Sequence, residues 1–550
     1  MDMKKQIAEK IANILNLESV ELEVPPNLSM GDYSLPCFPF AKELRKAPMQ
    51  IAEDIKGKLE LDIIEKVEVV AGYLNIFVKK EDFVSNILEK INEDYGSTFE
   101  GEGKRALVEH TSINPNASPH VGRARNALIG DSITRLLKFN KYDVEVHYFV
   151  NDIGKQISML LVGTKEVKEV TFENLLNIYV DINRRVKEDP ELEKEVFENL
   201  SKLESGDKET IAKFRNIVEI CINGQKAIFE AIGINYDFYD YESDFIVNGD
   251  TNKILEKLKE SGRLFEAEDG RLVLNQEEYN IPIESKVLVL TRGDKTSLYP
   301  LRDIAYSIHK MKRGADKNII VLGEDQKLYY KQIQSSLDLL GHSSADVIHY
   351  SFVLLPEGKM STRNGTVVLL EDFMSEILEK VKTELQNRSG EVDIEKAKSI
   401  AYGAVKYTIL KCSNEKNVIF DLDTALSFEG DTSLYIQYNY ARICSILSKA
   451  KSSHDKNYAL LKEDLEIELI QKLGNFPNII KRAMEALSPN IIANYVYDLA
   501  KTFGSYYHDF NILNIEDEDL KNMRLLLIEK IQIVIKNSLD LLGIDVVETI

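Results

Sequence analysis

The fold is decided by residues 105–139, which read RALVEHTSINPNASPHVGRARNALIGDSITRLLKF. Residues 105–112 form a short apolar run that predicts a strand, and the spacing predicts a helix over 118–139. Five apolar residues recur at helical spacing and would share roughly one face of that helix: Val121, Ala124, Leu128, Ile133 and Leu136. The stretch therefore predicts a strand that turns directly into a helix.

The segments that follow continue to alternate strands with helices. Strand-like runs are expected at 143–152, 286–292, 318–324 and 347–355, with helices at 301–312 and 329–341. Strands that alternate with helices imply a parallel sheet, so the sequence predicts a doubly wound nucleotide-binding fold. Residues 155–225 are charged and helical, which suggests an insertion into that fold.

The whole chain is predicted to be a multidomain α/β protein, because 550 residues are too many for one core. Residues 1–100 are expected to form a small α/β domain, with two strands around a turn at Gly72 and a helix broken near Pro48. A Rossmann-like parallel-sheet domain is expected at 101–375, with its helical insertion at about 155–225. An all-helical domain is expected at 376–550.

The composition excludes some classes of protein and leaves others open. A net charge of −21 counts against phosphate binding, but a local basic groove can sit on an acidic protein. No stretch approaches the roughly 18 consecutive apolar residues that span a bilayer, and the N-terminus lacks a secretory pattern. We therefore expect a cytoplasmic protein with no membrane partner. The cysteines lie far apart, which predicts reduced thiols and no structural zinc: Cys37, Cys221, Cys412 and Cys444.

The first chemistry-bearing segment is Ser118-Pro119-His120-Val121-Gly122-Arg123, at the predicted junction of strand and helix. Free backbone N–H groups and the helix dipole favour an anion at such a junction. Gly122 lets a nucleotide approach the backbone closely, and His120 could donate a hydrogen bond to a phosphate oxygen. A lone His-x-Gly also starts helices that bind nothing, so this segment is weak evidence by itself.

The second segment is the loop GKMSTRNG at 358–365, which follows the last predicted strand of the sheet. Two glycines bracket its basic residues, and such a loop could close over a triphosphate. Lys359 and Arg363 would then offset charge on a leaving pyrophosphate. The alternative is a solvated basic loop.

Together the two segments resemble the signatures of class I aminoacyl-tRNA synthetases, His-Ile-Gly-His and Lys-Met-Ser-Lys-Ser. Other stretches narrow the resemblance to arginyl-tRNA synthetases: VEHTSINPNASPHVGRARNALIGD, YFVNDIGKQ, LYPLRDIAYS, GEDQKLYYKQ and GKMSTRNG. Two later stretches are similar to the family's helical anticodon-binding domain: FDLDTALSFEGDTSLYIQYNYARICSIL and NSLDLLGID. GDYSLPCFPFAKELRKAP resembles its N-terminal domain, which binds the tRNA elbow. The resemblance covers nearly the whole chain.

This resemblance implies a catalytic domain at 101–375 and a two-step ligase reaction. Arginine attacks the α-phosphate of ATP to form arginyl-adenylate, and the arginyl group then passes to the 2′ hydroxyl of the terminal adenosine of arginine tRNA. The implied partners are ATP with Mg²⁺, L-arginine and arginine tRNA, and we expect a monomer. The family's requirement for bound tRNA before adenylate formation is implied as well.

The resemblance also assigns an arginine pocket to five positions: Glu109, Asn114, Tyr299, Asp303 and Gln326. Asp303 and Glu109 would supply charged acceptors to a planar guanidinium. Tyr299 offers a ring face and a hydroxyl, while Asn114 and Gln326 suit the α-amino group. Each residue alone could instead have a structural role, such as a helix cap at Asp303.

For ATP, the resemblance implies binding by Ser118, His120, Gly122, Lys359 and Met360, and a catalytic set of His120, Gly122, Arg123, Lys359, Ser361 and Arg363. Two departures from the family pattern concern positive charge. Arg123 stands where most class I enzymes have histidine, and Thr362 replaces the second lysine of the later signature. The position that carries a compensating lysine in some relatives is Ala117, so we expect Arg123 or Arg363 to provide the charge.

The anticodon contact is expected in the helical domain, where aromatic and polar residues are dense. The candidates are Tyr435, Gln437, Tyr438, Tyr440 and Arg442, with Tyr495, Tyr506 and Tyr507 as weaker ones. Unstacked bases could stack on such rings and bond to the glutamine or arginine. The alternative is a buried helix with tyrosines in its core.

Three other classes of function remain open at this point: another class I synthetase, a non-catalytic paralogue and a small-molecule nucleotidyltransferase. A cysteinyl-tRNA synthetase is disfavoured because paired cysteines are missing, and a glutamyl enzyme because Asp303 would repel an anionic substrate. The altered signatures leave room for a non-catalytic tRNA-binding paralogue. A small-molecule nucleotidyltransferase shares the His-x-Gly signal but would not need the long helical C-terminal half.

Overall fold

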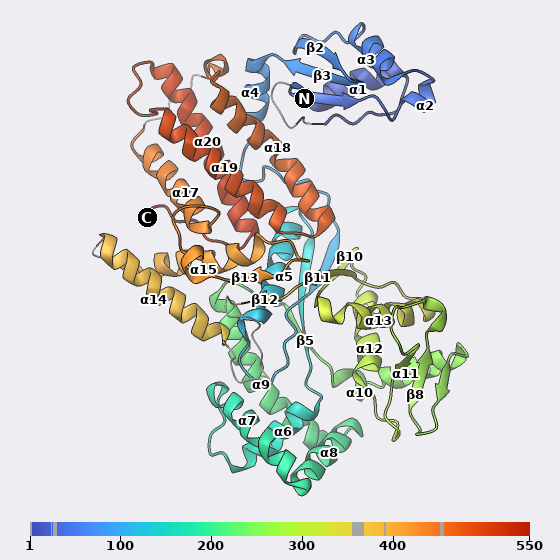
Figure 1. Cartoon of the computed structure of the whole chain (residues 1–550). Coiled ribbons are helices and arrows are strands. Elements are labelled where there is room, and N and C mark those ends of the chain that lie inside the picture. The colour runs from blue at the N-terminus through green and yellow to red at the C-terminus, as the bar shows by residue number, and fades with distance from the viewer. Residues whose placement is uncertain (1–2, 24, 26–29, 355–367, 390–391, 451–455) are drawn as a thin grey trace.

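The computed structural model describes residues 3–23, 25, 30–354, 368–389, 392–450 and 456–550. Its centre is a sheet of five parallel strands in the order β11-β10-β4-β5-β6 (Figure 1). The strands are β4 (Arg105–Glu109), β5 (Asp143–Val150), β6 (Phe238–Tyr241), β10 (Lys317–Gly323) and β11 (Asp346–Tyr350). Along the chain, β5 and β6 are added on one side of β4, and β10 and β11 are then added on its other side. In open α/β sheets, ligands bind beside such a switch point, at the carboxyl ends of the strands.

The parallel sheet predicted from the sequence is confirmed, with one strand assigned wrongly. The run 286–292 contains β9 (Val287–Val289), which belongs to a separate antiparallel sheet with β7 (Leu264–Glu266) and β8 (Leu272–Asn275). An apolar run looks the same in either kind of sheet, so its composition could not reveal its partner. The run 347–355 is likewise divided between β11 and β12 (Val353–Leu354), and β12 pairs with β13 (Val418–Ile419).

The sheet has a separate apolar cluster on each face, as the alternation of side chains along β10 shows. Ile319 and Val321 join the cluster that includes α5 (Val121–Phe139), while Ile320 joins the cluster of α12 (Tyr299–Lys312) and α13 (Lys327–Leu339). Helix α5 begins at Val121, three residues later than the predicted start at Ser118, and ends at Phe139 as predicted. It packs tightly because Gly130 has no Cβ: one would lie 2.2 Å from Cγ of the buried His110.

Two excursions interrupt the nucleotide-binding fold. The first is helical, as expected, and continues past residue 225 to Ala231, through α6 (Lys155–Gly163), α7 (Phe172–Glu188), α8 (Pro190–Glu204) and α9 (Lys208–Ala231). The second, between β6 and α12, contains α10 (Asp244–Val247), α11 (Asp250–Glu260) and the antiparallel sheet. Figure 1 shows these excursions at the opposite end of the molecule from the N-terminus.

The N-terminal unit is the small α/β structure that the sequence predicts. Its sheet has the order β1-β3-β2, with β2 and β3 joined at Gly72 and α3 beginning at Pro48. The elements are α1 (Met3–Leu15), β1 (Tyr33–Pro36), α2 (Ala41–Leu44), α3 (Pro48–Lys56), β2 (Ile64–Val70), β3 (Tyr73–Val78) and α4 (Lys80–Leu88). Helix α4 packs on α18 (Asp464–Ala486) of the C-terminal region, and the Tyr95 hydroxyl donates to the Leu473 carbonyl at 3.0 Å.

Where it is described, the C-terminal region is helical apart from β13. It consists of α14 (Leu370–Ser389), α15 (Ile394–Leu410), α16 (Leu422–Ala425), α17 (Ser433–Ser448), α18 (Asp464–Ala486), α19 (Asn490–Asp509) and α20 (Glu518–Leu541). Among the described residues, no helix is both long and apolar enough to cross a membrane.

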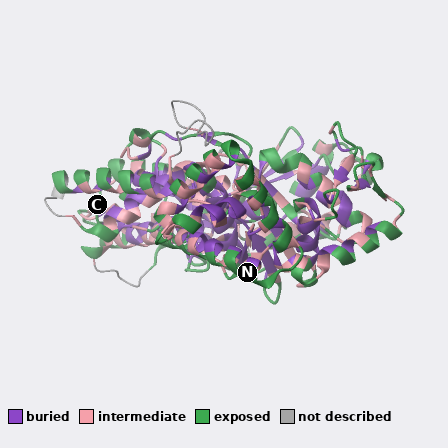
Figure 2. Ribbon diagram, turned by 90° about the horizontal axis from the view of Figure 1, so that it is seen from below, coloured by how far each residue is buried: buried purple, intermediate pink, exposed green. Residues whose placement is uncertain are grey.

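One apolar cluster runs from the N-terminal unit through α5 to the C-terminal helices, and Figure 2 shows the buried residues along the length of the molecule. Helix α5 contacts α15, α18 and α20, and the Ser132 hydroxyl donates to the Leu541 carbonyl at 2.8 Å. The buried guanidinium of Arg125 donates to the carbonyls of Ser351, Ser413 and Lys416. Helix α5 is thus held by the parallel sheet and by the C-terminal helices at once.

Candidate active site

A cavity of about 380 Å³ opens beside the carboxyl end of β4, between the α5 and α12 sides of the sheet. All five residues expected to form the arginine pocket line it: Glu109, Asn114, Tyr299, Asp303 and Gln326. They come from the end of β4, the loop after it, helix α12 and the turn before α13. The fold therefore brings together residues that are distant in the sequence.

Asn114 reaches the cavity because the backbone turns sharply after β4. Thr111 and Ser112 both have positive φ, at 73° and 44°, a conformation that costs energy for residues with a side chain. Two hydrogen bonds hold the turn: the Thr111 N–H donates to Asn126 at 2.6 Å, and the Ile113 N–H donates to the Tyr148 hydroxyl at 3.0 Å. Strained backbone held by neighbours is common at functional sites.

Asp303 lies inside the cavity and faces Tyr329, whose hydroxyl donates a short hydrogen bond to the carboxylate. Burial raises the pKa of Asp303 to about 6, although the Tyr329 hydroxyl and Arg302 oppose the rise. The ring of Tyr299 lies 5.2 Å from that of Tyr329 and is half exposed, at 54%. The carboxylate is thus kept from bulk solvent, with an aromatic ring beside it.

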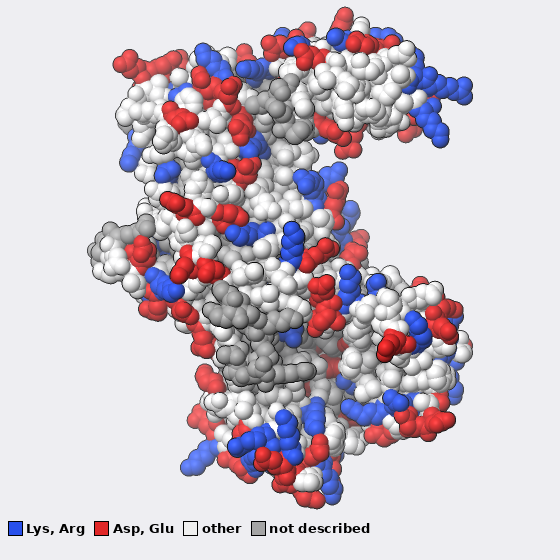
Figure 3. Space-filling view, in the orientation of Figure 1, with Lys and Arg blue, Asp and Glu red and all other residues white. Residues whose placement is uncertain are grey.

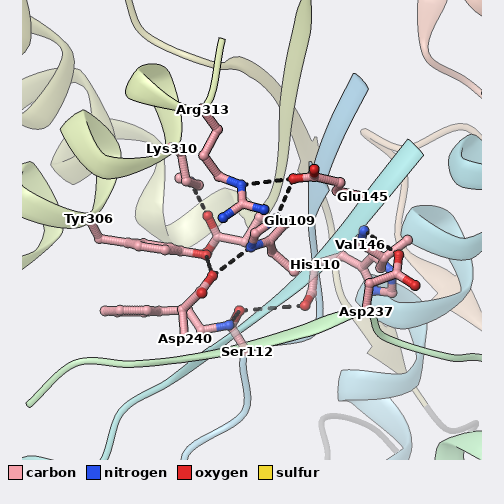
Figure 4. A network of polar contacts seen from close by, with 12 residues as sticks. Glu109, His110, Ser112, Glu145, Val146, Asp237, Asp240, Tyr306, Lys310 and Arg313 are labelled. Atoms are coloured by element: carbon pink, nitrogen blue, oxygen red, sulfur yellow. Dashed lines mark hydrogen bonds and ion pairs between the residues drawn. The ribbon is translucent and has the colours of Figure 1, made fainter. Parts of the chain in front are cut away.

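Glu109 is already paired with a cation, which the sequence did not suggest. Its Oε2 accepts a hydrogen bond from the ammonium of Lys310, and both side chains are buried (Figure 4). The Lys310 nitrogen also lies 4.4 Å from the centre of the Tyr306 ring. Tyr306 and Lys310 follow Asp303 by three and seven residues on α12, and this helical spacing was the available signal.

The same network continues away from the cavity along the sheet (Figure 4). The Tyr306 hydroxyl donates to Asp240 at 2.8 Å, and Asp240 lies 2.6 Å from Nδ1 of the buried His147. Beyond it, hydrogen bonds from Arg313 and Arg105 hold the pKa of Glu145 near 2. A second buried pair, Glu242 with Arg302, lies behind Asp303, and Glu242 lines the cavity.

The first signature segment has buried polar atoms without partners. Ser118 Oγ and His120 Nδ1 have no hydrogen-bond partner among the described residues. Burial, with a smaller effect of Arg123, lowers the pKa of His120 to about 4, so the imidazole is neutral at neutral pH. Ser118, His120 and Gly122 do not line the cavity but stand at the start of α5, whose Arg123 does line it. Buried polar atoms without partners fit a ligand that carries donors or acceptors.

The second signature lies outside the described residues, and with it Lys359, Met360, Ser361, Thr362 and Arg363. The chain that follows it is described and lies against the first signature. The Val121 N–H donates to the Val368 carbonyl at 3.1 Å, and the Leu370 N–H donates to the Pro119 carbonyl at 2.8 Å. The residues from Val368 to Leu370 are therefore hydrogen-bonded to the backbone at the start of α5.

The residues expected to contact RNA are divided between surface and core. Arg442 lies between the rings of Tyr438 and Tyr507, at 4.7 and 4.3 Å, and both rings are partly exposed. Gln437 is fully buried and donates to the carbonyls of Ser399 and Asp545. Tyr435 is half buried, and the other candidates lie in the core: Tyr440, Tyr495 and Tyr506. Figure 3 shows Lys and Arg side chains interspersed with Asp and Glu on one face of the molecule.

Family models match three consecutive parts of the chain. Residues 1–78 match the arginyl tRNA synthetase N terminal domain, residues 84–422 the catalytic domain of class I (R) tRNA synthetases, and residues 436–550 the DALR anticodon binding domain.

Complete proteins are similar to the chain over its full length. The arginine–tRNA ligase of Clostridium acetobutylicum is 37% identical over 100% of both chains, and that of Methanocaldococcus jannaschii is 36% identical over 99% of both. The solved structure of the Thermus thermophilus arginyl-tRNA synthetase superposes with a TM-score of 0.85 at 28% identity, covering 100% of both chains.

Proposed function

This chain belongs to the class I arginyl-tRNA synthetases and is an arginine–tRNA ligase, and from that premise we propose how its residues divide the reaction. The observation that supports the assignment is the cavity that gathers Glu109, Asn114, Tyr299, Asp303 and Gln326 beside the start of α5. Arginine occupies this cavity, and ATP binds at the junction of strand and helix next to it.

Asp303 is the charged acceptor for the arginine guanidinium. A buried carboxylate forms strong charge-assisted hydrogen bonds to the guanidinium fork, and the exposed Tyr299 ring packs against it at the mouth. Asn114 and Gln326 bind the α-amino group together with the Glu109 oxygen that Lys310 leaves open. Lysine lacks the fork and citrulline lacks the charge, so both are rejected.

Ser118, His120 and the helix N-terminus near Gly122 hold the ATP phosphates. Both side-chain atoms without partners, Ser118 Oγ and His120 Nδ1, fit phosphate oxygens. The later signature completes the site: Lys359, Met360, Ser361 and Arg363, with Arg123 or Arg363 providing the charge of the missing lysine. Lys359 and the Mg²⁺ that accompanies ATP offset the charge of the pyrophosphate.

The tRNA lies along the N-terminal and helical regions. Residues 1–100 bind its elbow, residues 101–375 form the catalytic domain, and residues 376–550 form the stem and read the anticodon. Tyr435, Tyr438 and Arg442 contact the anticodon, with Tyr507 beside them, because a guanidinium between two exposed rings offers surfaces on which bases stack. Gln437 supports this face from the core. The enzyme acts as a cytoplasmic monomer.

Aminoacylation of total tRNA with each amino acid separately tests the assignment, and only arginine is expected to be attached. Arginine-dependent pyrophosphate exchange should occur with tRNA and fall to background without it, as in the family. Exchange that stays absent even with tRNA would identify a non-catalytic paralogue.

The affinity for arginine is expected to fall as the pH drops. Burial raises the pKa of Asp303 to about 6 and that of Glu242 to about 7, so both carboxyls become protonated, and lose their charge, below these values. The guanidinium stays charged throughout, so weaker binding reflects the protein. The KM for arginine should rise about tenfold at one pH unit below the pKa of Asp303. A KM that is constant between pH 5.5 and 8 would contradict ionised Asp303 as the acceptor.

A further inference from the structure

The proposed arginine cavity contains a buried cation that the mechanism does not use. Lys310 has 1% of its side chain exposed, and its ammonium pairs with Glu109, whose side chain is 6% exposed. A lysine is rarely buried this deeply unless it is paired with an acidic group. Removing either partner would leave a buried charge uncompensated and would destabilise the folded protein. The pair therefore keeps both groups charged.

Among the described residues, the charged groups inside the cavity form two buried pairs and leave one partly buried carboxylate, Asp303. Glu109 is paired with Lys310, and Glu242 is paired with Arg302. Asp303 has a tyrosine hydroxyl, not a cation, as its hydrogen-bond partner. Arg123 and Asp325 also line the cavity but are exposed at its mouth. Inside its mouth, the described lining of the pocket thus carries a formal charge of one negative unit, on Asp303.

We propose that Lys310 is a specificity-determining residue that acts through Glu109, because it sets the charge of the arginine pocket to match one net positive charge. Free arginine carries two cationic groups and one carboxylate, and its net charge is one positive unit. Without Lys310 the pocket would carry two negative units and would favour a dication. The inference rests on the proposed arginine site and names how that site selects its ligand.

Agmatine, which is arginine without its carboxylate, is the dication that tests this inference. It keeps the guanidinium and the primary amine, so the ratio of its dissociation constant to that of arginine reports the charge preference. Losses of affinity that affect both ligands cancel in this ratio. Equilibrium dialysis of labelled arginine against the full-length enzyme, with agmatine as competitor, gives both constants.

Lys310→Met is expected to shift the ratio toward agmatine by about tenfold or more, since one added unit charge near the ligand has at least this effect. Glu109→Gln leaves Lys310 unpaired and should shift the ratio in the opposite direction. The double variant Glu109→Gln/Lys310→Met removes one charge of each sign and should return the ratio to within about threefold of the wild-type value. If Lys310→Met does not fold, the proposal is still tested by the opposite shift of the ratio in Glu109→Gln and by the return of the ratio in the double variant.

Lys312→Met is the matched control, because Lys312 is exposed on the same helix and should leave the ratio unchanged. A ratio that Lys310→Met does not change would overturn the proposal. A shift that the double variant fails to reverse would also overturn it, because Lys310 would then act on the ligand directly. Failure of the wild-type enzyme to bind arginine in this cavity would instead refute the site itself.

Discussion

Replacing Asp303 by Asn is expected to lower kcat/KM for arginine by about 100-fold or more, the largest effect predicted for any pocket residue. The side chain keeps its shape but loses the charge that faces the guanidinium. Removing one partner of a buried, hydrogen-bonded charge pair costs about 3 kcal/mol, which corresponds to this factor. Steady-state aminoacylation with varied arginine measures the change, which should appear mainly in KM for arginine.

Asp325→Asn is the matched control for this experiment. Asp325 also lines the cavity, but it is exposed in the turn before α13. Its charge is screened by solvent, so the KM for arginine should change less than about threefold. Equal effects of the two substitutions would show that the field of the cavity, and not a contact at Asp303, selects arginine.

Replacing His120 by Ala is expected to slow arginyl-adenylate formation by about 100- to 1000-fold, while the dissociation constant for arginine stays unchanged. A preorganised donor to charge that develops at phosphate is worth this much in related oxyanion sites. His120 is suited to such a role because burial keeps it neutral and its Nδ1 has no partner among the described residues. Single-turnover adenylate formation in the presence of tRNA measures the rate directly.

His120→Asn provides the graded comparison, because asparagine keeps one donor near the same place. It should retain more activity than the alanine variant. If both variants react as fast as the wild-type enzyme, His120 only occupies the position before α5, and the phosphates are held elsewhere.

The sequence alone predicted the secondary-structure elements that depend on residues within one segment. The apolar run predicted as a strand at 105–112 contains β4, and the helical spacing predicted at 118–139 contains α5. Gly72 and Pro48 stand where a turn and a helix start require them. The five pocket positions came from family resemblance, and they line one cavity. Their meeting depends on strand order, which no single segment specifies.

The remaining features depend on contacts between distant segments. The strain at Thr111 and Ser112 has no composition signal, since neither residue is glycine. Gln437 was a candidate for RNA contact because it lies in a dense run of aromatic and polar residues. In the structure it is buried, because α17 is packed by both α19 and α20. The pairing of Glu109 with Lys310 requires α12 to lie over the end of β4.

The unbroken interior that α5 shares with the C-terminal helices limits how this polypeptide can be divided. Leu136 on α5 and Leu541 at the end of α20 belong to one apolar cluster, although they lie in different family modules. A gene fragment that ended with the nucleotide-binding part would leave the flank of α5 bare to water. The modules that family models recognise in the sequence are therefore not units of folding. The smallest fragment that can fold by itself is larger than any one of them.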